Sequence, residues 1–168
     1  MKSSYKSGFT LVEVLVSILL TGLAFMLFLQ ALNTSKNVRV KSELRIRQSA
    51  LLNSIENLIR ARKFDENNLA PWTSALSLGV DSNETSINQF DDVDDFNNYN
   101  TASISDYPGF SYDIKVFYSV PEILTSVNAE KYFFNYSDDQ TNYKSIVISV
   151  SHLTLNTLND TLILTPKP

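Results

Sequence analysis

An uninterrupted apolar run near the amino terminus constrains the fold of this chain more than any other feature. Residues 9–32 read FTLVEVLVSILLTGLAFMLFLQAL, and Glu13 is their only charged side chain. A helix of this length spans about 36 Å at roughly 1.5 Å per residue, which is enough to cross the ~30 Å hydrocarbon layer of a bilayer. The sequence therefore predicts a membrane helix near its start.

The residues before this run are typical of an export signal. MKSSYKSG contains Lys2 and Lys6 and no acidic residue, as the n-region of such a signal does. No small-x-small cleavage site follows the run, because Gln30 and the polar residues 33–35 stand there instead. Cleavage after the apolar segment is therefore not expected, and the helix should remain in the mature protein.

The junction SGFTLVEVLVS resembles the leader of type IV prepilins and pseudopilins. Gly8 stands directly before Phe9, and Glu13 follows the glycine by five residues. The resemblance implies that a prepilin peptidase cuts after Gly8 on the cytoplasmic side and that Phe9 becomes the N-methylated mature terminus. Residues 1–8 would then be a cleaved leader. Residues 9–32 would be the transmembrane and assembly helix, in contact with inner-membrane lipid.

Glu13 needs a physical explanation because it is an acid inside an apolar segment. A carboxylate within a membrane helix costs about 2.5–3.5 kcal/mol on insertion scales, so such residues usually have a partner or a role. The family resemblance implies that the partner is the free amine of Phe9 on a neighbouring subunit. The alternative is that Glu13 lies near enough to the membrane edge to reach headgroups and water.

Two features depart from the family pattern. Major pilins usually carry a helix proline about 22 residues after the cut, and Gln30 occupies that position here. This difference favours a minor pilin or a pseudopilin. In addition, basic residues are more numerous after the apolar run than before it, so the positive-inside rule taken alone predicts the opposite orientation. These residues are Lys36, Arg39, Lys41, Arg45 and Arg47. The cleavage motif predicts a cytoplasmic N-terminus and a head outside the cytoplasm.

The sequence beyond the membrane segment predicts a longer helix followed by a head. Residues 33–63 contain no Pro or Gly, and their apolar residues form one helical stripe. The stripe consists of Leu44, Leu51, Ile55, Leu58 and Ile59. We therefore expect a nearly continuous helix over residues 9–63, of which residues 33–63 are amphipathic. Residues 64–109 are rich in Asn, Asp, Ser and Thr, which predicts a variable region of loops with one short helix.

Alternating apolar residues predict an antiparallel sheet in residues 110–168. The expected strands are 110–120, 131–136, 143–152 and 161–165, with turns at 137–142 and 156–160. The predicted class is therefore α+β, in which the C-terminal half of a long N-terminal helix packs on a small antiparallel sheet. This order of elements resembles the pilin fold.

Two further motifs resemble one pilin subfamily. ARKFDENN at 61–68 and FDDVDDF at 90–96 are similar to segments of the D-type minor pilin of mannose-sensitive haemagglutinin (MSHA) pilus systems. The resemblance implies a structural subunit that acts in pilus assembly, initiation or adhesion, with other pilin or pseudopilin subunits as partners. A minor pseudopilin of a type II secretion system is the alternative.

Charge and composition restrict the other function classes. Residues 1–63 carry ten Lys and Arg against three Glu, whereas residues 64–168 carry four against fifteen Asp and Glu. The acidic part would repel phosphate, so no nucleic acid is expected as a partner. No catalytic motif is present, and the single histidine, His152, is expected at the edge of the core rather than in catalysis. The chain is therefore not predicted to be an enzyme.

The acidic run in residues 90–96 is the one candidate for metal binding. Ca²⁺ binds six to eight oxygen ligands, often from loops of this kind. The candidate ligands are Asp91, Asp92, Asp94 and Asp95. The run lacks the glycine and the closing glutamate of an EF-hand loop, and a solvated acidic turn is the alternative. A membrane-anchored, calcium-dependent adhesin or binding module is accordingly a further possible function, and no other cofactor is expected.

Overall fold

The computed structural model describes residues 8–102, 104–126 and 129–166. The chain divides into two compact units, residues 1–43 and 44–168. Of the predicted leader 1–8, only Gly8 lies among the described residues. The α+β class is confirmed: one long helix is followed by an antiparallel sheet.

The helix α1 extends from Leu11 to Arg60, close to the predicted range of 9–63. Differences of this size at helix ends are ordinary. Within the first unit, every side chain from Gly8 to Glu43 is exposed, including the large apolar residues of the membrane segment. None of the described residues 8–43 covers this apolar surface, so lipid or other helices must cover it if it is to be removed from water.

The last part of α1 is amphipathic and belongs to the second unit. Leu51, Leu52, Ile55 and Ile59 are buried, while the predicted stripe residues Leu44 and Leu58 are half-buried. Gln48 is also buried, and its side-chain NH₂ donates to the carbonyls of Val150 at 2.8 Å and Asn156 at 3.0 Å. The polar group of Gln48 is therefore satisfied where the helix meets the sheet.

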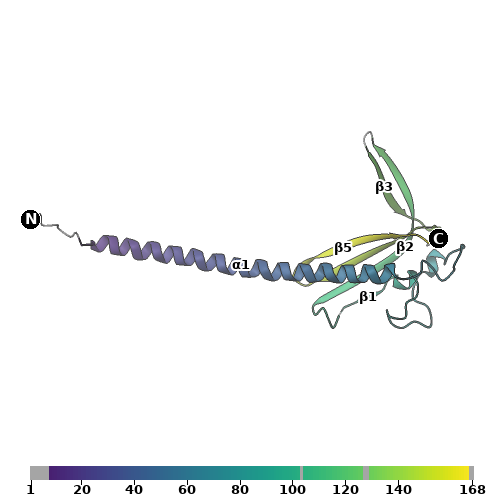
Figure 1. Ribbon diagram of the computed structural model, residues 1–168, viewed down its shortest axis with the longest axis horizontal. Helices are drawn as coiled ribbons and strands as arrows, with labels where there is room; N and C mark the ends of the chain where they lie inside the picture. The colour runs from purple at the N-terminus through teal and green to yellow at the C-terminus, as the bar shows by residue number, and fades with distance from the viewer. Residues whose placement is uncertain (1–7, 103, 127–128, 167–168) are drawn as a thin grey trace, which may run out of the picture. The chain divides into compact units, whose positions relative to one another are not determined.

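The sheet contains five strands. They are β1 (Asn100–Thr101), β2 (Phe110–Ser126), β3 (Ala129–Tyr136), β4 (Lys144–His152) and β5 (Leu155–Leu164). The order is β1-β2-β4-β5, and β3 pairs with β2 outside this path. All pairings are antiparallel, and β2 pairs with β4 from Phe110↔His152 to Tyr118↔Lys144. Figure 1 shows β2, β4 and β5 beside the last turns of α1.

The predicted turn at residues 156–160 is wrong, because β5 includes these residues. The turn lies earlier, at Leu153–Thr154, where the backbone N–H of Thr154 donates to the imidazole Nδ1 of His152 at 3.2 Å. In the sheet order, β5 is the last strand and pairs with β4. Polar residues are common on such an edge strand because one side faces water, so their presence did not indicate a turn.

The strands β3 and β4 pair with opposite edges of β2. The carbonyl of Tyr118 accepts a hydrogen bond from Ser137, while the N–H of Ser119 donates to Tyr143, both at 2.9 Å. The C=O and N–H of one trans peptide group point in opposite directions. Residues 137–143, which include the predicted turn at 137–142, therefore carry the chain from one edge of β2 to the other.

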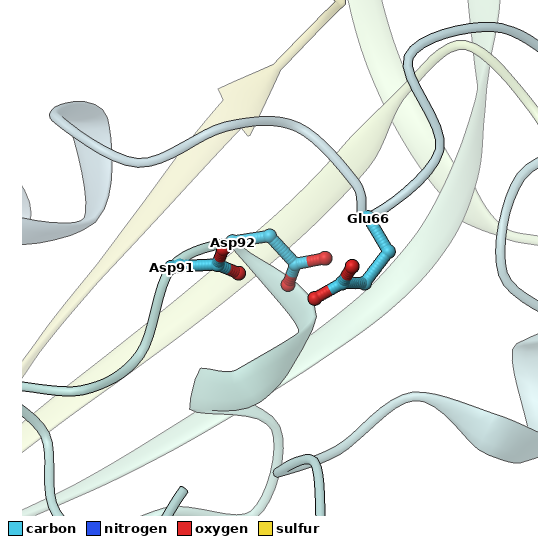
Figure 2. Close-up of side chains that lie close together, drawn as sticks. All are labelled: Glu66, Asp91 and Asp92. Carbon is cyan, nitrogen blue, oxygen red and sulfur yellow. The ribbon is translucent and has the colours of Figure 1, made fainter. Parts of the chain in front are cut away.

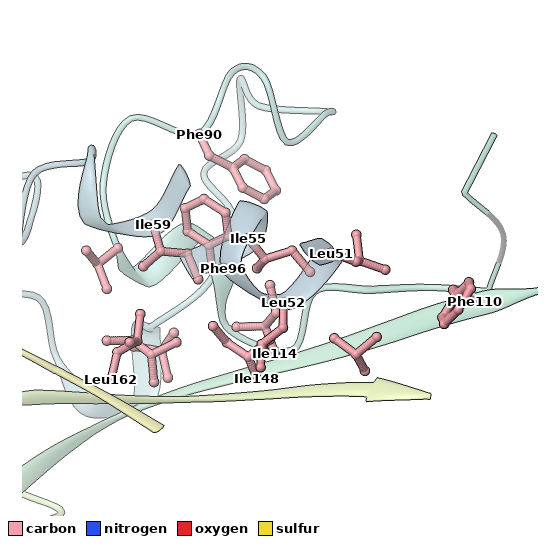
Figure 3. Close-up of a cluster of buried hydrophobic side chains, with 14 residues drawn as sticks. Leu51, Leu52, Ile55, Ile59, Phe90, Phe96, Phe110, Ile114, Ile148 and Leu162 are labelled. Atoms are coloured by element: carbon pink, nitrogen blue, oxygen red, sulfur yellow. The ribbon is translucent and has the colours of Figure 1, made fainter. Parts of the chain in front are cut away.

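Residues 64–109 contain two short 3₁₀ helices rather than the one short helix that was predicted. These are η1 (Ala75–Ser77) and η2 (Asp94–Phe96). Phe90, Val93 and Phe96 are buried, and the rings of Phe90 and Phe96 meet edge to face at 5.1 Å. Figure 3 shows both rings beside the side chains of α1 and the sheet. This segment therefore contributes part of the hydrophobic core.

A fully buried lysine joins three segments of the second unit. The ammonium of Lys144, at the start of β4, donates to Asp65 Oδ2 at 2.9 Å, to Asp94 Oδ1 at 2.8 Å and to the carbonyl of Phe64 at 2.6 Å. It also lies 4.6 Å from the centre of the Phe64 ring. The side chains of Lys144 and Asp65 are fully buried, so the three donors are satisfied by protein acceptors.

Replacing Lys144 with methionine should destabilise the head severely. The substitution keeps an unbranched apolar side chain but leaves the carboxylates of Asp65 and Asp94 buried without their cation, a loss of about 3–5 kcal/mol in comparable cases. Denaturant titration of the full-length chain in detergent, followed by circular dichroism, measures this change.

The matched control is Lys63→Met, because Lys63 makes an exposed ion pair with Asp91 at 3.5 Å. Exposed ion pairs contribute about 0–1 kcal/mol, so the free energy of unfolding of this variant should be close to that of the parent. Equal free energies of unfolding for the two variants would contradict the role given to Lys144.

Candidate functional site

The first turn of α1 brings the predicted assembly residue Glu13 back onto the residue before the helix. Glu13 Oε2 accepts hydrogen bonds from the Thr10 N–H at 2.8 Å and the Thr10 hydroxyl at 2.9 Å. The Thr10 hydroxyl oxygen in turn accepts from the Glu13 N–H at 3.3 Å. This reciprocal arrangement is a capping box, with Thr10 as N-cap and Glu13 as the third helical residue.

Our reading of the sequence did not include this cap, although its signal was present. The pattern Thr-x-x-Glu directly before an apolar run predicts a capping box, and residues 10–13 have it. The cap satisfies donors that the start of a helix would otherwise leave open. Glu13 therefore has a local structural role that would persist whether or not it also meets a second subunit.

Gly8 and Phe9 precede the cap and lie outside the helix. Phe9 is 84% exposed, and among the described residues nothing beyond its chain neighbours would meet a Cβ placed on Gly8. The peptide bond between these two residues is therefore sterically open to an enzyme. Whether it is cleaved and whether Phe9 is methylated remain predictions.

The acidic loop forms two groups of carboxylates that share Asp91. Ligand oxygens of Glu66, Asp91 and Asp92 lie within 4.8 Å of one another, and so do those of Glu84, Asp91 and Asp95. We call these five residues the acidic cluster. Figure 2 shows the carboxylate groups of Asp92 and Glu66 facing each other, with that of Asp91 beside them.

Three of the four aspartates predicted as metal ligands are in the acidic cluster, and one is not. Asp91, Asp92 and Asp95 are members, whereas Asp94 pairs with Lys144. Glu66 and Glu84 were not predicted. Glu66 follows α1 and Glu84 belongs to the loop after η1, and no local pattern links positions so far from the aspartates.

Backbone hydrogen bonds hold the aspartates of the turn in place. Asp95 Oδ2 accepts from the N–H groups of Asp91 and Asp92, both at 3.1 Å, and Asp92 Oδ1 accepts from the Asp94 N–H at 2.8 Å. Asp92 Oδ2, by contrast, is buried and has no hydrogen-bond partner. The turn is therefore ordered, but one of its acceptors is unsatisfied.

The electrostatics of the cluster favour protonation. Burial, together with the neighbouring Asp94 and Asp95, raises the pKa of Asp92 to about 9, against the opposing effect of Lys144. Burial and the nearby carboxyls of Asp95, Asp91 and Asp81 raise the pKa of Glu84 to about 7. A group of acids in this state gains by binding either protons or a cation.

His152 is half-buried at the end of β4, as the sequence predicted for a residue at the edge of the core. Its ring lies 4.5 Å from the ring of Phe110 between centres. The Thr154 hydroxyl is 3.1 Å from the imidazole Nδ1. Contacts of this kind indicate a packing role.

Comparison with known proteins identifies the N-terminal segment. Residues 3–29 match the family model for the prokaryotic N-terminal methylation motif. The match indicates a type IV pilin-like or pseudopilin protein, a class of structural subunits, and it supports processing by a prepilin peptidase. Curated proteins and solved structures give no match. Among the described residues, α1 is long and apolar enough to span a membrane, which fits anchoring in the inner membrane.

The raised pKa of Asp92 predicts a pH dependence of stability in the presence of a chelator. An acid whose pKa is higher in the folded state binds its proton more tightly there, so stability is lost as pH rises from about 4 towards 9. Asp92→Asn removes this ionisation but keeps the Oδ1 acceptor. Relative to the parent, the free energy of unfolding of the variant should therefore be higher at pH 8 than at pH 5 by at least about 1 kcal/mol. This minimum is smaller than the free energy that corresponds to a shift of one pKa unit.

Denaturant titrations of the full-length chain at the two pH values measure this difference. Asp139→Asn is the control, because Asp139 is exposed and lies outside the acidic cluster. The same pH response in both variants would show that Asp92 is not the group responsible.

Proposed function

We propose that this chain is a minor structural subunit of a type IV pilus-like fibre and that Glu13 joins it to a neighbouring subunit. Prepilin peptidase removes residues 1–8, the apolar helix holds the protein in the inner membrane with its head outside the cytoplasm, and helix packing then recruits it into the fibre. The observation that carries the proposal is the position of Glu13. It is the single carboxylate of the exposed apolar segment at residues 9–32, most of which lies within the match to the methylation motif.

The surface of the first unit supports assembly through the helix. Large apolar side chains from Leu11 to Leu32 are all at least 47% exposed, so they can pack against lipid before assembly and against other helices afterwards. Head-to-tail contacts of this kind form open helical filaments when the rotation between copies does not close a ring. The new amine of Phe9 would supply the positive charge that an acid among apolar helices needs.

The finer assignment is also a proposal. A minor subunit is favoured over a major one because Gln30 replaces the usual proline, and α1 continues through this position. The motifs at 61–68 and 90–96 favour an MSHA-type minor pilin that acts in assembly, initiation or adhesion. A minor pseudopilin of a type II secretion system shares the first of these features and is the second candidate. In either case the subunit performs no catalysis.

Glu13→Gln separates the capping role of Glu13 from its proposed charge. Glutamine also forms a capping box, so the first turn of α1 should survive the substitution. If the amine of a neighbouring subunit requires a carboxylate, incorporation into fibres should fall at least tenfold, as it should for Glu13→Ala. Immunoblots of sheared fibres against the membrane fraction measure this ratio.

Ser17→Ala is the matched control for these variants. Ser17 lies one turn further along α1, and its hydroxyl donates to the Glu13 carbonyl at 2.7 Å, so the substitution removes a polar group without removing charge. Normal incorporation of Glu13→Gln into fibres would contradict the ion-pair proposal and leave capping as the role of Glu13. A membrane tether that never polymerises would be indifferent to all three substitutions.

The processing step predicts a definite mature terminus. Mass spectrometry of the protein from cells that contain prepilin peptidase should find N-methylated Phe9 as the first residue. Gly8→Val should retain Met1, because it removes the glycine that stands directly before the cut in the prepilin motif. Ser7→Ala serves as the control and should be processed normally. Recovery of the unsubstituted chain with residues 1–8 still attached would refute the processing claim.

A further inference from the structure

We propose that the acidic cluster is a Ca²⁺ site formed by carboxylate oxygens of Glu66, Glu84, Asp91, Asp92 and Asp95. This inference goes beyond the proposed assembly function, because it concerns the head and does not involve Glu13. It also differs from the predicted set of ligands, since Asp94 is replaced by the two glutamates.

The geometry provides ligands from three separate stretches of chain. Within each of the two groups, oxygens lie no more than 4.8 Å apart, and Asp91 belongs to both. Two ligands on one Ca²⁺ at 2.3–2.6 Å can be separated by up to about 5 Å. The carboxylates of each group are therefore already within the spacing that one ion requires, and Asp91 would bridge the two positions.

A buried orphan oxygen gives independent evidence for a ligand. Asp92 is 1% exposed, and its Oδ2 has no hydrogen-bond partner. Its other oxygen accepts from the backbone N–H of Asp94, which fixes the side chain while Oδ2 receives no hydrogen bond. Figure 2 shows this carboxylate directed towards Glu66. Buried polar atoms normally have a partner, and a cation among these carboxylates would supply one.

The available lysines do not balance the cluster. Lys63 pairs with Asp91 at 3.5 Å, and both side chains are at least half exposed. Lys144 is committed to Asp65 and Asp94 in the interior. In the part of the chain that the structure describes, Asp91 is therefore the one carboxylate of the acidic cluster that forms an ion pair with a lysine.

The ligand type selects Ca²⁺ among the common metal ions. All five candidates are carboxylates, which are hard oxygen ligands, and the chain has no cysteine. Carboxylates on loops suit the variable coordination of Ca²⁺, whereas Mg²⁺ requires a nearly ideal octahedron with shorter bonds and retains several waters. A bound Ca²⁺ would tie the segment after α1 to the loop at Glu84 and to η2, and so would order residues 64–96.

Calorimetry on the full-length chain in detergent tests the proposal. After dialysis against a chelator and its removal, titration with CaCl₂ should give a saturable binding isotherm with Kd between about 10⁻⁵ and 10⁻³ M, the range of weaker calcium sites. The melting temperature should rise in the same titration. Asp92→Asn should raise Kd at least tenfold and abolish most of the thermal shift.

Controls make the result decisive. Glu66→Gln replaces an exposed ligand and should also raise Kd, which keeps the test valid if Asp92→Asn does not fold. Asp139→Asn removes one exposed negative charge elsewhere and should bind like the parent. Absence of heat and of a thermal shift at millimolar CaCl₂ would overturn the proposal. So would an equal response to MgCl₂ at the same ionic strength, or equal weakening by Asp139→Asn, because either would indicate charge screening rather than a site.

Glu13→Gln should bind Ca²⁺ normally, so failure of this site and failure of assembly are separable.

Discussion

The arrangement of the head depends on the buried ammonium of Lys144. A charge in the interior is tolerated only when it is paired and its donors are satisfied, and here Asp65, Asp94 and the Phe64 carbonyl do both. These partners come from the segment after α1 and from η2, while Lys144 belongs to β4. The ion pairs therefore fix the acidic loop against the sheet. Asp94 is therefore held by Lys144, and the neighbouring Asp92 keeps one buried oxygen without a hydrogen-bond partner.

Periodicity was sufficient to predict the elements with regular patterns. The apolar run and the stripe Leu51, Ile55 and Ile59 gave α1 to within a few residues, because helical spacing places such residues on one face. The alternation from Phe110 to Val120 predicted the first part of β2, which continues to Ser126. Glu13 was recognised as unusual because one charge in an apolar helix is conspicuous in any sequence.

The interactions that cross the chain could not be predicted in this way. Lys144 is separated from Asp94 and Asp65 by 50 and 79 residues, and nothing near it in sequence shows that it is buried. The places of Glu66 and Glu84 in the acidic cluster were unpredictable for the same reason, because tertiary contacts bring them there and no local sequence pattern marks them. The error at residues 156–160 has another origin, because an edge strand and a turn share the same polar composition.

Under the proposed assembly through Glu13, the cap at the start of α1 has a consequence for how subunits would leave a fibre. Because Thr10 already offers two donors to Glu13 within one chain, a carboxylate that parts from a neighbouring amine has hydrogen bonds to return to at once. The free energy that holds a subunit in the fibre is then the difference between two states of Glu13, one paired with the amine and one hydrogen-bonded to Thr10. It is smaller than the full strength of an ion pair in an apolar environment. In the proposed fibre, such joints would let end subunits return to the bilayer and be incorporated again.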